Sequence, residues 1–143
     1  MSFHEKSAIS MLGIMVFIYG WYFAKVFAMA SEGPVEPAAI GTLLFGMVVG
    51  LVVLSIIAHI LIAGISTARG EEDVDASDER DKSIEMSSNS KSSYILAFGV
   101  LIALGLSLLE YPHFTIAHVL LAALVLSEIF KLALKIFAYR RGY

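Results

Sequence analysis

Four long apolar segments, separated by polar connections, limit this chain to a small set of folds. They cover residues 7–30, 38–66, 92–109 and 114–137, and no proline falls inside any of them. A helix needs about 20 apolar residues to cross the hydrocarbon core of a bilayer. Of the 143 residues, 58% are hydrophobic, whereas a soluble domain of this size buries only about 70% of its unfolded surface. The sequence therefore predicts an all-α membrane protein with a four-transmembrane-helix bundle in a single domain.

The first apolar segment also has the charged start and apolar run of a secretory signal peptide. The apolar region of a cleavable signal is about 7–15 residues long, whereas this segment extends from residue 7 to residue 30. Its length favours a membrane-spanning helix. Ala28-Met29-Ala30 matches the small-x-small pattern of a cleavage site, so cleavage stays open as the alternative.

The three connections differ in length, and this difference predicts how the helices pair. Residues 31–37 and 110–114 are short connections that contain proline, whereas residues 67–91 form a long polar connection. Short connections make neighbouring helices antiparallel. We therefore expect two antiparallel hairpins joined by a charged loop at 67–91.

Lysine and arginine residues predict the orientation in the membrane. The short connections contain none, whereas the chain ends and the long connection contain Lys6, Arg69, Arg80, Lys82, Lys91, Arg140 and Arg141, with Lys135 close by. Connections rich in lysine and arginine stay in the cytoplasm. The predicted topology is N-in/C-in, with the 67–91 loop inside and both short turns outside.

The long connection contains signals for the start of a helix. Asp78 is a favourable N-cap, and Glu79 and Asp81 are acidic residues suited to a first helical turn. We expect a helix that starts near Glu79 and either continues into the third apolar segment or reconnects after the polar residues 87–90, which are weak helix formers.

Asp78, Glu79, Arg80 and Asp81 are candidate partner-docking residues. Two interpretations compete for this segment. One is a solvated extension of the third helix, and the other is a docking surface for a cytoplasmic protein or for the basic C-terminal tail 139–141. Binding of the loop to the membrane surface is disfavoured, because its net negative charge is repelled by anionic lipid.

His59, Glu128 and Lys131 are ionisable residues inside predicted spans. Such groups are costly in lipid, by roughly 2.5–3.5 kcal/mol at the centre of a span, and often mark function. The second and fourth spans run in the same direction, which places the three residues at similar depth. One interpretation is a structural Glu128–Lys131 pair at the membrane boundary. The alternative is a polar site in the bundle interior with His59 as proton acceptor.

Gly46 and Gly50 form a GxxxG pattern in the second span. Glycines one turn apart let two helix backbones approach closely. The pattern indicates either packing within the bundle or the face of a homo-oligomer.

Several function classes are disfavoured by what the chain lacks. It contains no cysteine and no nucleotide-binding, hydrolase or metalloprotease motif. No second histidine lies near His59 in sequence, so no metal site is expected. A net charge of −3 does not favour nucleic acid as a partner. We expect no cofactor, no catalytic residues and no enzymatic activity.

Two stretches in the second half of the sequence resemble a group of membrane proteins. Asp78-Glu79-Arg80-Asp81, followed by Ile84 and by Tyr94 at the start of a span, resembles a group of uncharacterised small prokaryotic four-helix integral membrane proteins with this motif before the third helix. The fourth segment, VLLAALVLSEIFKLALKIFAYRRG, is similar to theirs as well. The resemblance implies the four-helix fold and a prokaryotic plasma (inner) membrane location, and it implies no activity.

These patterns lead to two functional hypotheses. The first is a multi-pass, non-enzymatic regulatory or scaffolding protein that acts on a cytoplasmic protein partner through the 67–91 loop and the C-terminal tail. The alternative is a small oligomeric ion or solute transporter that uses His59 and Glu128. In both hypotheses the chain is embedded in the lipid bilayer.

Overall fold

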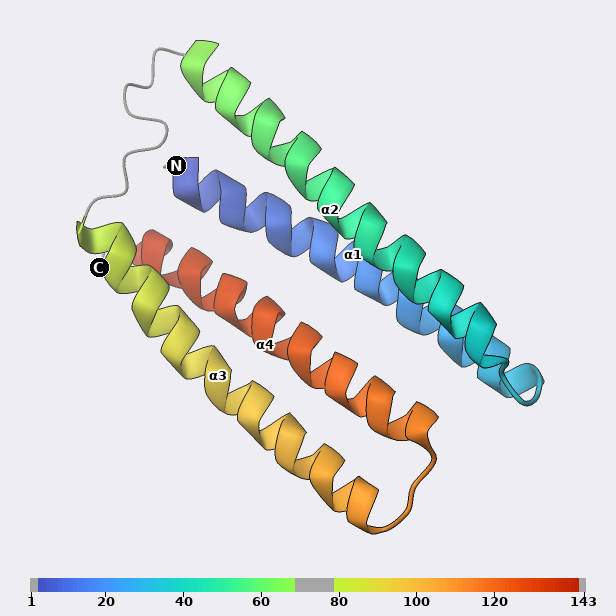
Figure 1. The fold of residues 1–143 in the computed structure, drawn as a ribbon. Helices are drawn as coiled ribbons and strands as arrows, with labels where there is room; N and C mark the ends of the chain where they lie inside the picture. Colours follow the sequence, from blue (N-terminus) through green and yellow to red (C-terminus); the bar gives the residue numbers. More distant parts are fainter. Residues whose placement is uncertain (1–2, 69–78, 142–143) are drawn as a thin grey trace. The chain divides into compact units, whose positions relative to one another are not determined.

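The computed structural model describes residues 3–68 and 79–141, which form four α-helices (Figure 1). These helices are α1 (Phe3–Glu32), α2 (Pro37–Ala68), α3 (Glu79–Leu108) and α4 (His113–Arg141). Over these two ranges there is no β-strand. The predicted all-α class is confirmed.

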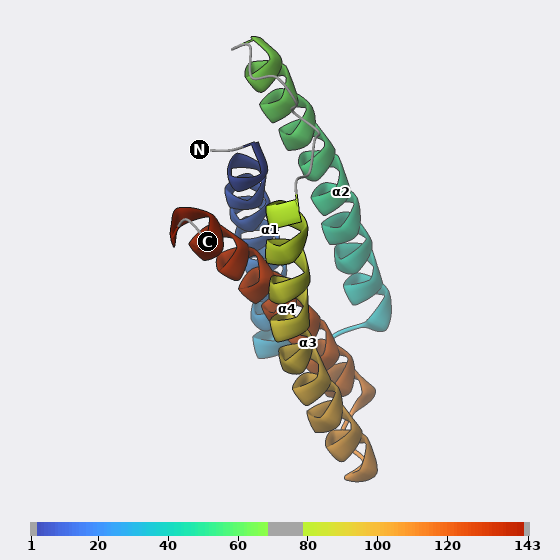
Figure 2. The same ribbon diagram turned by 90° about the vertical axis from the view of Figure 1, so that its left-hand side faces the viewer.

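The helices form two compact units, each of them a hairpin. One unit contains α1 and α2, and the other contains α3 and α4. Within each unit the chain reverses through a short connection, as Figures 1 and 2 show. The pairing predicted from the connection lengths is therefore observed within each hairpin.

The turn of the first hairpin is built from residues with fixed backbone preferences. Gly33 has φ 148°, a backbone conformation that residues with a side chain rarely adopt. Pro37 is the first residue of α2, where its missing N–H costs no hydrogen bond. The Glu36 carbonyl accepts the N–H of Ala39 at 3.1 Å. Together these features stop one helix and start the next within a few residues.

The turn of the second hairpin ends α3 with a Schellman motif. The Tyr111 N–H donates to the Leu106 carbonyl at 3.0 Å, and the Glu110 N–H donates to the Ser107 carbonyl at 3.1 Å. Glu110 has φ 56°, in the left-handed region that glycine usually occupies at this position. The Pro112 carbonyl then accepts the N–H groups of Thr115 and Ile116 in the first turn of α4, at 2.9 and 3.2 Å. The expected tight reversal at 110–114 is confirmed.

Three of the helices are long and apolar enough to cross a membrane, judged by length and composition. These are α1 from Glu5, α2 and α3, with mean hydropathies of 1.6, 2.8 and 1.7 in their most apolar windows. The fourth predicted span, 114–137, lies in α4, which is not one of the three. The composition of the described helices thus indicates a membrane location.

The third helix begins where the sequence predicts a helix within the charged connection. Because α3 begins at Glu79 and is continuous through residues 87–90, the second half of the predicted 67–91 loop is helical. The hydroxyls of Ser92 and Ser93 donate to carbonyls one turn earlier, at 3.0 and 2.7 Å, so these polar groups are satisfied within the helix. The helix start near Glu79 is confirmed, whereas the predicted N-cap Asp78 lies outside the described residues.

The helices α3 and α4 approach each other closely at Gly99. A Cβ atom placed on Gly99 would lie 2.1 Å from the Cβ and 3.4 Å from the Cα of Ala123. Both residues are buried, and Ser92 and Ala103 are also buried at helical spacing from Gly99. Small residues therefore let the two backbones approach closely, and this contact sets the register of the hairpin.

Candidate functional site

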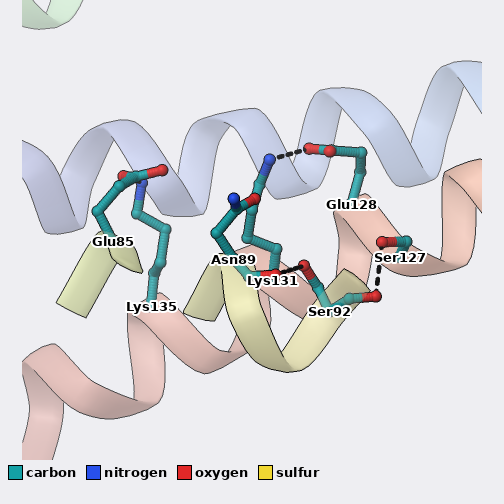
Figure 3. A network of polar contacts seen from close by, with 7 residues as sticks. All are labelled: Glu85, Asn89, Ser92, Ser127, Glu128, Lys131 and Lys135. Carbon is teal, nitrogen blue, oxygen red and sulfur yellow. Dashed lines mark hydrogen bonds and ion pairs between the residues drawn. The ribbon is translucent and has the colours of Figure 1, made fainter. Parts of the chain in front are cut away.

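Polar side chains join α3 to α4 in the half of the hairpin that contains the start of α3. The Tyr139 hydroxyl donates to Asp81 Oδ1 at 2.9 Å. The Lys135 ammonium forms an ion pair with Glu85, and the buried Ser127 hydroxyl donates to the Ser92 carbonyl at 2.8 Å. Figure 3 shows the last two pairs. We call these three pairs, Asp81–Tyr139, Glu85–Lys135 and Ser92–Ser127, the polar ladder.

The spacing of the polar ladder follows from helix geometry. Asp81 and Glu85 are four residues apart on α3, and Lys135 and Tyr139 are four residues apart on α4. Residues four apart lie on the same face of a helix. Because the two helices are antiparallel, Asp81 lies opposite Tyr139 and Glu85 lies opposite Lys135. Each acidic residue therefore faces a donor on the opposite helix.

Glu128 and Lys131 form an ion pair within α4. Lys131 Nζ lies 2.5 Å from Glu128 Oε2, and the two side chains are 18% and 33% exposed, respectively. Figure 3 shows the pair beside the polar ladder. The expected pairing of these two charges is present, with each neutralising the other.

His59 lies on α2, in the other hairpin, and lines a groove between α1 and α2. The groove has a volume of about 420 Å³, and Ser7, Ser10 and Ser55 also line it. The Ser55 hydroxyl donates to the Leu51 carbonyl at 2.6 Å. Among the described residues, no group of three or more histidine, aspartate or glutamate side chains is arranged to hold a metal ion.

The structure divides the four docking candidates by their surroundings. Glu79 and Arg80 are exposed in the first turn of α3. Asp81 is half-buried and accepts the hydrogen bond from Tyr139. Asp78 lies outside the described residues. Through Tyr139, the C-terminal part of α4 therefore contacts the acidic start of α3, which was one of the predicted interactions for the tail.

The GxxxG glycines of α2 have different neighbours. A Cβ placed on Gly50 would lie 3.7 Å from Ile18 Cδ1 of α1, an ordinary van der Waals distance. At Gly46, no atom of the described chain lies within 4 Å of the corresponding position. Gly50 therefore contributes to packing in its hairpin, whereas Gly46 presents an open backbone surface there.

The polar ladder was not among the features predicted from the sequence. A signal was present, because an acidic pair on one helix and a donor pair on the next had equal spacing. The groups in the ladder satisfy one another by hydrogen bonds and charge pairing, which is the chemistry of a structural brace. Comparisons of the chain with protein-family models, with curated proteins and with solved structures find no match.

Proposed function

We propose that this chain is a multi-pass membrane protein without enzymatic activity, which regulates or scaffolds a cytoplasmic partner through the start of α3. In this proposal the four helices form a membrane bundle in a prokaryotic plasma membrane, with both termini in the cytoplasm. The apolar character of α1, α2 and α3 supports the membrane location. The distribution of lysine and arginine supports the orientation.

The observation that carries the proposal is the braced extension of α3. Residues 79–91 continue α3 beyond its apolar part, and α4 holds this extension through Asp81–Tyr139 and Glu85–Lys135. A surface held in one conformation loses little conformational entropy when it binds a partner. The brace therefore suits the extension to protein recognition.

The exposed face of the extension has the composition of a docking surface. Glu79, Lys82 and Met86 follow one helix face, and they line a shallow groove with Ser83 and Ser87. Met86 is 73% exposed, and flexible methionine side chains are common at protein-binding surfaces. Charges of both signs around an exposed methionine fit a partner surface of mixed charge with an apolar centre.

Replacement of Glu79 and Arg80 tests this proposal. We expect Glu79→Ala/Arg80→Ala to insert and fold like the wild type, because both side chains are exposed, but to lose a cytoplasmic protein that the wild type captures after cross-linking in cells. Quantitative mass spectrometry of the purified complexes measures the loss. The matched control is Glu110→Ala, which removes an exposed charge at the opposite end of the hairpin. Equal capture by the wild type and the double variant would contradict the proposal.

The alternative is an ion or solute transporter. The groove beside His59 and its three serines favours it, because these groups can hydrogen-bond a polar solute. It predicts that Glu128→Gln removes a pH-dependent flux in liposomes. A wild-type protein with no flux under a proton or solute gradient would exclude it.

A further inference from the structure

A basic pocket lies between α3 and α4, near the start of α3. Its volume is about 510 Å³. Three cationic side chains and three hydroxyls line it, and these six residues define the basic pocket: Arg80, Ser83, Ser87, Ser88, Lys91 and Arg141. Leu134, Phe137 and Ala138 of α4 add an apolar wall.

The charged side chains that line the pocket are all positive. Among the described residues that line it there is no carboxylate. Two nearby acidic side chains are engaged in the polar ladder, where Asp81 accepts from Tyr139 and Glu85 pairs with Lys135. Three positive charges around one concave surface attract an anion.

The donors in the pocket match the oxygens of a phosphate group. Arginine presents a planar fork of N–H donors that binds phosphate at two points, and lysine and serine supply further donors. The Arg141 guanidinium lies 4.3 Å from the centre of the Phe137 ring. This cation–π contact helps to hold the guanidinium at the pocket, which lowers the entropy lost on binding.

The position of the pocket points to a lipid. Lys91 directly precedes Ser92, where the apolar part of α3 begins, so the pocket lies where polar helix meets membrane span. An anionic lipid would place its phosphate among the cations and its acyl chains along Leu134 and Phe137. Basic pockets between membrane helices on the cytoplasmic side suit such head groups.

We propose that the basic pocket binds the phosphate group of an anionic phospholipid. The inference rests on the membrane placement in the proposed function, and it requires no protein partner. Binding would fix the depth of α3 and connect the docking surface to the lipid composition of the membrane.

Lipid binding to the purified full-length chain tests this inference. Native mass spectrometry from detergent micelles measures the affinity for dioleoylphosphatidylglycerol, for dioleoylphosphatidylcholine and for inorganic phosphate. We expect phosphatidylglycerol to bind most tightly. The variant Lys91→Gln/Arg141→Gln should weaken this binding at least about tenfold, because it removes two charge-assisted contacts. The control Lys6→Gln/Lys25→Gln removes the same charge from α1, outside the pocket, and should bind like the wild type.

A second variant removes the pocket without changing its charge. Ser87→Leu places a larger side chain in the pocket and should also weaken the binding of phosphatidylglycerol, while the circular dichroism spectrum stays that of the wild type. Equal affinities of the wild type and both pocket variants would overturn the inference. Binding of inorganic phosphate without binding of phosphatidylglycerol would overturn the assignment to lipid.

Arg80 belongs both to the basic pocket and to the docking candidates, so the lipid test is separated from the test of the proposed function by a pocket variant that leaves Arg80 in place. Lys91→Gln/Arg141→Gln retains Glu79 and Arg80, so a loss of lipid with continued partner capture concerns the pocket alone. Conversely, lipid binding by a wild-type chain that captures no partner would support the pocket and contradict the scaffolding function.

Discussion

The substitution Gly99→Ala is expected to destabilise the α3–α4 hairpin by about 1–3 kcal/mol, the cost of overpacking a close contact. The new methyl group would lie 2.1 Å from the Cβ of Ala123, which is too close for two carbon atoms that are not bonded to each other. The helices would have to separate, and this separation would weaken the neighbouring Ser92–Ser127 hydrogen bond of the polar ladder. The free energy of unfolding, from circular dichroism during titration of mixed micelles with dodecyl sulfate, measures the effect.

Two further variants control this prediction. Gly105→Ala lies on the same helix with no neighbouring atom of the described chain within 4 Å of its new methyl group. This variant should be as stable as the wild type, or more stable by up to about 1 kcal/mol, because alanine has a higher helix propensity than glycine. Gly99→Ala/Ala123→Gly moves the methyl group to the other helix and should recover part of the lost stability. A Gly99→Ala protein as stable as the wild type would contradict the close contact.

The substitution Lys131→Met is expected to destabilise the protein by about 2–3 kcal/mol, because it leaves Glu128 without its ion-pair partner in an apolar helix. The double variant Lys131→Met/Glu128→Leu removes both charges. It should return close to wild-type stability, because replacement of a whole pair by apolar residues is often neutral. The same unfolding titration measures both variants.

The difference in stability between Lys131→Met and the double variant is the result that tests this prediction. If Lys131→Met and the double variant were equally stable, leaving Glu128 without its partner would have no cost, and the prediction would be contradicted. The double variant also separates the two functional hypotheses. A transporter that uses Glu128 would lose its flux in a stable protein, whereas a scaffold would keep its partner.

Much of the fold could be predicted from the sequence because its determinants are local. The lengths of the apolar segments, Pro37 and Pro112 in the short connections, and Glu79 at the start of a helix each act within a few residues. The sequence left open whether the helix from Glu79 continues through residues 87–90, and in the structure it does. Serine is a weak helix former, but Ser88 and Ser92 are buried in the hairpin, and tertiary packing overrides propensity there.

The candidate site was less predictable because it depends on the register between two helices. The Glu128–Lys131 pair is three residues apart on one helix, so the sequence alone indicated it. The polar ladder and the basic pocket join α3 to α4, so they require the register set at Gly99 and Ala123. A glycine opposite an alanine is common in membrane helices, and the sequence does not show which pair meets.

The proposed function depends most on the cytoplasmic position of the α3 extension, and cysteine accessibility tests this position directly. The chain contains no cysteine, so Ser90→Cys in the extension and Glu36→Cys and Glu110→Cys in the short turns each report one site. A membrane-impermeant maleimide is added to right-side-out and to inverted membrane vesicles. We expect the turn cysteines to react only in right-side-out vesicles and Ser90→Cys only in inverted ones. Labelling of Ser90→Cys in right-side-out vesicles would contradict this expectation.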